Sequence, residues 1–173
     1  MKLIEFRRFT RYRVGIAAEA FAAGMFALAG YDVLVQYGAN QPNYDLVIFN
    51  GKKSLPISVK GSQDGGWGLT HGLMTNKDYH GAIDIWLRKH GSNIVFCLVQ
   101  FQGKKIGDCP DVFLATSNEI AKTLKNARGG HGETVIYMHR KYQKGVGKGV
   151  EFRIPKTWRF SQERIQNLFD NVT

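Results

Sequence analysis

Apolar residues recur along the chain with two spacings, one typical of helices and one typical of strands. Apolar positions three, four or seven residues apart predict helices, and short runs rich in Val, Ile, Leu and aromatic residues predict strands. The order of these elements predicts an α/β fold with a mixed sheet flanked by helices. The predicted elements are a helix at about 14–29, strands at 31–38, 44–50 and 55–60, a helix opening at 75, strands at 93–101 and 112–115, a helix at 117–127, a strand at 134–138 and a helix opening at 161.

Local signals refine several of these elements. The strand at 93–101 is apolar on both faces, which is typical of an interior strand covered by helices. Capping-box spacings from Thr75 to Asp78 and from Thr116 to Glu119 predict the starts of two helices. The first helix is predicted to carry one apolar stripe formed by Val14, Phe21, Met25 and Leu28.

Length and charge limit the classes of function. A chain of 173 residues suits a single domain spanning 1–173, and 43% hydrophobic residues exclude intrinsic disorder as its main state. The chain has 24 Lys and Arg against 14 Asp and Glu, a net charge of +10. This surplus favours an anionic partner, with nucleic acid first and a membrane surface second. A basic protein with no such partner is the alternative.

The cysteines and the apolar segments predict a cytoplasmic protein. Cys97 and Cys109 fit neither a zinc site nor a disulfide framework, which favours a reducing compartment. The N-terminal sequence lacks an uninterrupted apolar run, which argues against a signal peptide. The most apolar stretch, 14–30, is shorter than the roughly 20 residues of a membrane span, so we expect no membrane segment.

The segment 44–60 predicts an acid and an amine on one face of a hairpin. If a loop at 50–53 joins the strands symmetrically, paired residue numbers sum to 103, which places Asp45 opposite Ser58. Lys60 then lies on the same face, diagonally across from Asp45. A bulge at Pro56 would shift this register. An ordinary cross-strand salt bridge is the alternative to a catalytic pair.

A second carboxylate lies in the first predicted helix. Glu19 is the only charged residue between Val14 and Gly30, and a helical wheel places it on the side of Ala22 and Phe26. We therefore expect partial burial, and a partly buried carboxylate needs a cation, a metal or a hydrogen-bond donor. The alternative is a glutamate that faces solvent.

Together these segments resemble the PD-(D/E)xK nuclease superfamily. The matching pieces are Glu19 in GIAAEAFAAGMFALAGYDV, Asp45 in PNYDLVIFN and Lys60 in PISVKGSQ, and they occur in the family's order. The resemblance covers roughly residues 12–101 and is strongest to the Holliday-junction-resolvase and homing-endonuclease side. It implies a restriction-endonuclease-like fold with an αβββαβ core.

The resemblance also implies a metal-dependent DNA endonuclease. Asp45, Glu19 and the Val59 carbonyl would bind Mg²⁺, or Mn²⁺, and Lys60 would position or activate the attacking water. Gln63 would hydrogen-bond the scissile phosphate or the water, and solvation of its loop is the alternative role.

One position departs from the family pattern. Ser58 occupies the place of the family's usual acid, two residues before the lysine, and leaves the site one carboxylate short. The site would then bind one ion with fewer protein ligands or borrow an acid such as Asp64. The alternative function is a catalytically impaired nucleic-acid-binding module of the same fold.

Two basic segments are candidates for binding a phosphate backbone. DNA is the expected partner, RNA is not excluded, and a homodimer would supply one site for each strand. Two solvated basic faces are the alternative. Trp67, in the glycine-rich segment after Lys60, would stack on a base or, as we favour, pack inside the protein. The basic residues are Arg7, Arg8, Arg11 and Arg13 in the first segment and Arg140, Lys141, Lys144 and Lys148 in the second.

Overall fold

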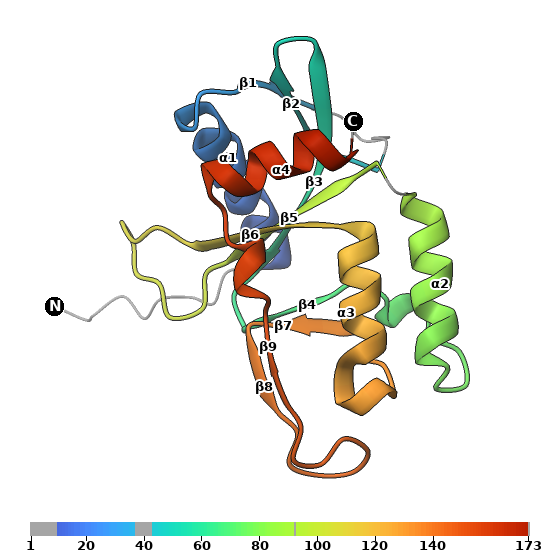
Figure 1. Ribbon diagram of the computed structural model, residues 1–173. Helices are drawn as coiled ribbons and strands as arrows, with labels where there is room; N and C mark the ends of the chain where they lie inside the picture. Colours follow the sequence, from blue (N-terminus) through green and yellow to red (C-terminus); the bar gives the residue numbers. More distant parts are fainter. Residues whose placement is uncertain (1–9, 37–42, 92, 173) are drawn as a thin grey trace, which may run out of the picture.

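The computed structural model describes residues 10–36, 43–91 and 93–172 (Figure 1). Its helices and strands follow the predicted order, with additional short strands at 66–68, 139–141 and 151–153. In chain order they are α1 (Arg11–Leu28), β1 (Asp32–Val35), β2 (Leu46–Asn50), β3 (Lys53–Ser62), β4 (Gly66–Gly68), the 3₁₀ turn η1 (His71–Leu73), α2 (Tyr79–His90), β5 (Val95–Gln100), β6 (Asp111–Thr116), α3 (Ser117–Gly130), β7 (Val135–Tyr137), β8 (His139–Lys141), β9 (Glu151–Arg153), the 3₁₀ turn η2 (Lys156–Trp158) and α4 (Gln162–Val172).

The central sheet is mixed, as predicted. Its strand order is β1-β2-β3-β5-β6, with β3 and β5 parallel and every other neighbouring pair antiparallel. The predicted αβββαβ core is confirmed, with β4 and η1 inserted before α2. Strands β4 and β7 form a separate ribbon, and β8 and β9 form another.

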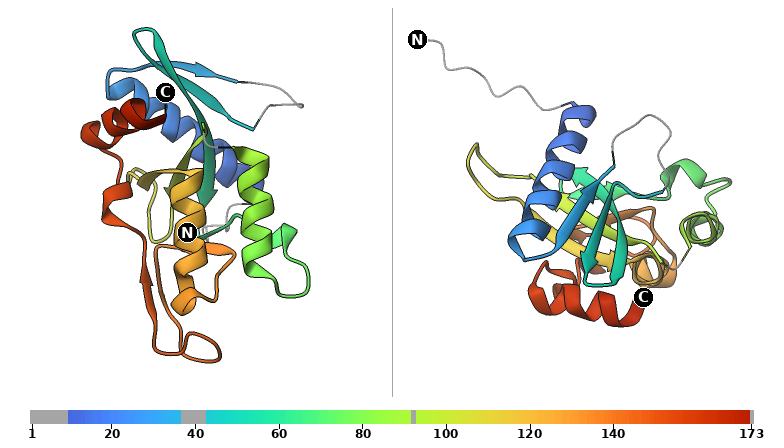
Figure 2. Two further views of the ribbon diagram at one scale, coloured as in Figure 1. Left: turned by 45° about the vertical axis from the view of Figure 1, so that its right-hand side comes forward. Right: turned by 90° about the horizontal axis from the view of Figure 1, so that it is seen from above.

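Helices cover both faces of the central sheet, which creates two apolar clusters (Figure 2). Residues of α1 and α4 pack on one face, and residues of α2 and α3 pack on the other. All six residues of β5 are buried, since its side chains alternate between the two clusters. This confirms the prediction of an interior strand at 93–101.

Helix α1 packs on the sheet through a row of residues four apart. The hydroxyl of Thr10 caps the helix by accepting a hydrogen bond from the Arg13 N–H at 3.4 Å. Because residues four apart lie on one face of a helix, a single stripe reaches the core. The buried residues are Val14, Ala18, Ala22 and Phe26.

The predicted stripe of α1 is largely wrong. Phe21 and Leu28 are 40% and 91% exposed, and Met25 is only half-buried. The helix instead turns its alanines toward the sheet at Gly61, where an added Cβ would lie 2.9 Å from the Ala18 Cβ. This approach is possible only with small side chains, and it leaves Phe21 and Leu28 facing outward.

The hairpin of β2 and β3 has the predicted register. Asn50 pairs with Lys53 and Leu46 with Ile57, so paired numbers sum to 103 throughout. The loop is tighter than predicted, because the strands extend to Asn50 and Lys53 and leave a two-residue turn at 51–52. Pro56 pairs with Val47 without shifting the ladder.

The structure corrects one helix start and confirms another. Helix α2 begins at Tyr79 rather than at Thr75, because Asp78 is its N-cap and accepts a hydrogen bond from the Gly81 N–H. The Thr116–Glu119 capping box is present at the start of α3. Trp67 is buried, as we favoured, and the predicted glycine-rich loop around it forms strand β4.

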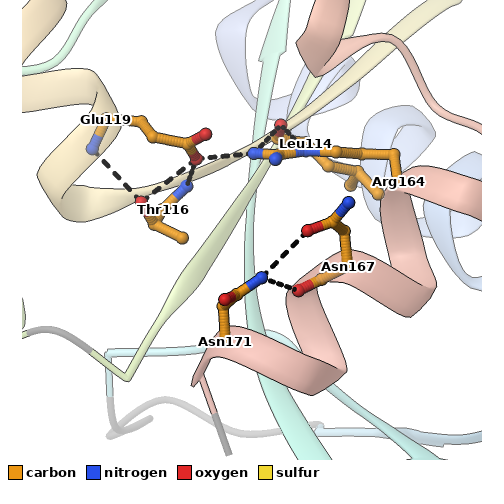
Figure 3. Close-up of polar contacts among 6 residues, drawn as sticks. All are labelled: Leu114, Thr116, Glu119, Arg164, Asn167 and Asn171. Carbon is orange, nitrogen blue, oxygen red and sulfur yellow. Dashed lines mark hydrogen bonds and ion pairs between the residues drawn. The ribbon is translucent and has the colours of Figure 1, made fainter.

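Arg164 attaches α4 to the edge of the sheet (Figure 3). Its guanidinium donates two hydrogen bonds to the Leu114 carbonyl, at 3.2 and 3.1 Å, and one to Glu119 Oε2 at 2.5 Å. The same carboxylate oxygen accepts the Thr116 N–H at 2.8 Å. One arginine therefore connects α4, strand β6 and the capping box of α3.

Within the described ranges, no helix has both the length and the apolar composition needed to cross a bilayer.

Candidate functional site

The carboxylate of Asp45 is held in place by the backbone of β3. Asp45 lies directly before β2 and extends the ladder, since its N–H donates to the Ile57 carbonyl at 2.8 Å. Its Oδ2 accepts the Val59 N–H at 2.6 Å and the Ser58 hydroxyl at 3.4 Å. These bonds orient the carboxylate across the hairpin, opposite Ser58, as the register requires.

The ammonium of Lys60 lies on the same side of the hairpin as this carboxylate. Its Nζ is 3.9 Å from Asp45 Oδ2, which is beyond hydrogen-bonding distance. The side chain of Lys60 is 41% exposed and that of Asp45 is 19% exposed. The pair is therefore open to a ligand from solvent, with the acid more deeply set than the amine.

Glu19, on α1, lies near enough to this pair for the charges of both residues to act on it. It is half-buried, beside the buried Ala22 on the neighbouring turn, as its place in the helix predicts. Its pKa is raised, first because burial disfavours its charge and second because of the nearby charge of Asp45, while Lys60 partly offsets the increase. Two carboxylates that repel each other form a site that a cation stabilises.

This shift predicts how stability depends on pH when no metal is bound. An acid whose pKa is higher in the folded than in the unfolded state loses stabilisation as the pH rises from the ordinary value, 4.5, through the raised one. We therefore expect Glu19→Gln to increase the free energy of unfolding at pH 7, by less than about 1 kcal/mol because solvent screens a group that is only half-buried. At pH 4 the difference should vanish.

Urea unfolding in the presence of a chelator, at pH 4 and at pH 7, measures both values. A matched control is Glu163→Gln, an exposed change in the first turn of α4. The opposite trend for Glu19→Gln, a stability that falls at pH 7, would contradict the proximity of the two carboxylates.

Two residues at this site were not predicted from the sequence. The indole Nε1 of buried Trp67 donates to the Lys60 carbonyl at 2.8 Å and fixes the backbone that carries the lysine. The ring of His90 packs against Trp86 and against Phe96, the ladder neighbour of Ser58. The only sequence signal for the first contact is a tryptophan seven residues after the lysine. No sequence signal exists for the second contact.

His90 is also influenced by the charge of Lys60. Its pKa is lowered, first by burial and then by the positive charges of Lys60 and Lys89. Its buried Nδ1 has no hydrogen-bond partner in the part of the chain that the structure describes. Burial and the nearby ammonium groups thus disfavour the protonated form of His90.

The oxygen ligands at this site fit a hard divalent cation but are few. Asp45 and Glu19 supply two carboxylates, and Mg²⁺ typically binds through one or two carboxylates, waters and substrate phosphates. Across residues 10–36, 43–91 and 93–172, no group of three or more His, Cys, Asp or Glu side chains is arranged to hold a metal ion. A cation would therefore depend on main-chain, water or phosphate oxygens for its remaining ligands.

The other predicted site residues lie close to this point along β3. Val59 uses its N–H to bind Asp45, and its carbonyl remains a predicted ligand. Gln63 is half-buried directly after the end of β3. Asp64, the acid that the site was predicted to borrow, instead accepts a hydrogen bond from the Ser62 hydroxyl at 2.9 Å.

The described parts of both predicted basic segments lie near the end of β3. An added Cβ at Gly61 would lie 2.8 Å from the Val14 carbonyl, so the first turn of α1, with exposed Arg11 and Arg13, adjoins Lys60. That turn contains no acidic residue.

The β8–β9 hairpin begins at the same end of the sheet, where the Met138 N–H donates to the Gly65 carbonyl. Lys141 lies on β8, while Lys144 and Lys148 lie in the connection, and all three are exposed. Their role in binding nucleic acid stays a prediction, and Arg7 and Arg8 lie outside the described residues.

No protein-family model matches the chain, and no curated protein matches it. Three solved chains do match, and one is Hjc of Archaeoglobus fulgidus, a Holliday junction resolvase from an archaeal hyperthermophile. The match has 16% sequence identity and a TM-score of 0.40, and it covers 71% of this chain and 88% of the resolvase chain. This similarity is too distant to transfer site residues or function, so the proposal below rests on the geometry of the chain itself.

Proposed function

We propose that the protein is a divalent-cation-dependent nuclease that hydrolyses phosphodiester bonds in DNA. The observation that carries the proposal is a partly exposed Asp45–Lys60 pair whose charges both act on the pKa of Glu19 in α1. Carboxylates and an ammonium are the groups that metal-assisted phosphodiester hydrolysis requires.

Each residue has a defined part in the reaction. Asp45 and Glu19 would hold the cation, Mg²⁺ or Mn²⁺, together with the Val59 carbonyl. A bound divalent cation polarises the phosphoryl group and lowers the pKa of a coordinated water. Lys60 places a positive charge where negative charge develops on the phosphate in the transition state. Gln63 would hydrogen-bond the phosphate or the water.

The positive charge around the site supports a polyanionic substrate. The first turn of α1 combines the positive end of the helix dipole with Arg11 and Arg13, a combination that attracts phosphate. The β8–β9 hairpin adds a second group of exposed positive charges near the site, Lys141, Lys144 and Lys148. A duplex lying across the end of β3 would contact both, and two copies of the chain would supply one site for each strand.

Ser58 favours a second candidate function. Its hydroxyl donates a hydrogen bond to Asp45, where the family pattern has a further acid, so the site has one carboxylate fewer for binding metal. A protein with this change and an intact basic surface would bind DNA without hydrolysing it. Measuring binding and cleavage separately distinguishes the two functions.

The test compares the wild-type protein with Lys60→Met on supercoiled plasmid DNA. We expect wild type to nick or cut the plasmid with Mg²⁺ or Mn²⁺ and not with EDTA. Lys60→Met should lose at least about tenfold in rate, because a charge that stabilises the transition state is removed. Its DNA affinity should change by less than about threefold, since one phosphate contact among many is lost.

A matched control is Lys52→Met, which removes an exposed lysine from the turn of the same hairpin. It should cleave at the wild-type rate. Tight binding without cleavage by wild type at any concentration of either metal would contradict the nuclease and support the binding module. Equal cleavage by wild type and Lys60→Met would remove the lysine from the mechanism.

A further inference from the structure

The connection between β5 and β6, residues 101–110, projects clear of the core (Figures 1 and 2). Its tip is a closed turn, because the Asp108 N–H donates to the Lys105 carbonyl at 3.1 Å. The Asp108 carboxylate also accepts the Lys105 N–H at 2.8 Å. Gly107, the third residue of the turn, has a φ of +94°, as a type II turn requires. The tip is therefore a defined structure.

Ile106 occupies the outer corner of this turn. Its side chain is 81% exposed, although it is large, branched and apolar. Lys105, also exposed, lies next to it in the turn. The turn thus presents an apolar tip with an adjacent positive charge.

This turn belongs to the same end of the sheet as the candidate site. Lys60 pairs with Leu98 in the β3–β5 ladder, and the Phe101 N–H continues the ladder by donating to the Ser62 carbonyl at 2.8 Å. The tip is five residues beyond Phe101, a reach of at most about 17 Å. That distance corresponds to about five base pairs of duplex, at 3.4 Å for each pair.

We propose that Ile106 is a wedge that inserts between neighbouring bases of the DNA bound at the Asp45–Lys60 site. The proposal rests on the proposed function, since it assumes that DNA occupies that site. Apolar side chains such as isoleucine enter base steps and partly unstack them, at a cost that is lowest where stacking is already weak. Lys105 would bind the adjacent phosphate.

The wedge gives the protein a preference among DNA substrates. A duplex interrupted by an unpaired base resists insertion less than an uninterrupted one, so the protein should bind the interrupted duplex more tightly. Arg11, Arg13 and the hairpin lysines contact only the backbone in this arrangement and would add no such preference.

The experiment uses two DNA duplexes, one uninterrupted and one with a single bulged base flanked by 2-aminopurine, whose fluorescence rises on unstacking. Binding is measured in EDTA, so that hydrolysis is absent. Wild type should favour the bulged duplex about tenfold and raise the fluorescence. Ile106→Ala should lose most of both effects, because it removes the one apolar side chain that the bulged duplex would bury. Its affinity for the uninterrupted duplex should stay at the wild-type value.

Leu28→Ala is the matched control, since Leu28 is 91% exposed at the far end of α1 and should behave as wild type. Wild-type preference and fluorescence in Ile106→Ala would overturn the wedge. Metal-dependent cleavage by a wild type that shows no preference for the bulge would overturn the wedge and leave the proposed function standing. Absence of both DNA binding and cleavage would overturn both.

Discussion

Asp45→Asn is expected to lower metal-dependent DNA cleavage by two to four orders of magnitude, roughly the several kcal/mol of transition-state stabilisation that a bound cation supplies. Asparagine has almost the same shape and keeps an oxygen to accept the Val59 N–H, so the hairpin should fold unchanged. The substitution removes one of the two carboxylates at the site. Calorimetric titration with Mn²⁺ and cleavage rates on the same preparation measure both effects.

Asp32→Asn provides the matched control, because Asp32 is an exposed carboxylate on β1 of the same sheet. It removes the same charge from the chain without touching the site, and it should keep wild-type metal binding and cleavage. A cleavage rate for Asp45→Asn within about threefold of wild type would show that hydrolysis occurs elsewhere or comes from a contaminant.

Gly61→Val is expected to have the largest effect on stability. A Cβ at this position would lie 2.8 Å from the Val14 carbonyl oxygen and 2.9 Å from the Ala18 Cβ, and both belong to α1. The backbone oxygen cannot move without shifting the helix, so we expect a loss of about 3 kcal/mol in the free energy of unfolding, the upper end of the overpacking range. The melting temperature should fall by roughly 6–12 °C.

The same change should also impair the site. Gly61 follows Lys60 directly, and a displaced α1 carries Glu19 away from Asp45. Gly68→Val is the control, because no atom lies within 4 Å of an added Cβ there and valine suits a strand. Equal melting temperatures for Gly61→Val and wild type would mean that α1 does not approach β3 this closely.

The hairpin that carries Asp45 and Lys60 could be worked out from sequence alone. The turn around Gly51, between two apolar runs, determines which residues pair, and alternation along each strand then determines which side chains share a face. The apolar residues of the hairpin support the same register, because Leu46, Ile57 and Val59 are buried on the face opposite Asp45 and Lys60. Local turn chemistry and burial therefore agreed before any long-range contact was considered.

The packing of α1 could not be worked out in the same way. The helix is apolar around most of its circumference, so the periodicity of its apolar residues does not indicate which side faces the sheet. The close approach of Ala18 to Gly61 selects the buried side, and that contact depends on a glycine more than forty residues away. The predicted stripe was wrong because the prediction favoured large apolar side chains, whereas the buried side is the one on which small side chains let the two backbones approach closely.

The amino-acid sequence by itself determined the order of the elements, the register of the β2–β3 hairpin and the convergence of Asp45 with Lys60, because each depends on residues near one another in the chain. Only the tertiary structure decided that Glu19 lies near this pair, that Trp67 holds the Lys60 carbonyl, and that α1 and the β8–β9 hairpin both start near the end of β3. These contacts join segments far apart in sequence, and their geometry follows from how the helices pack on the sheet.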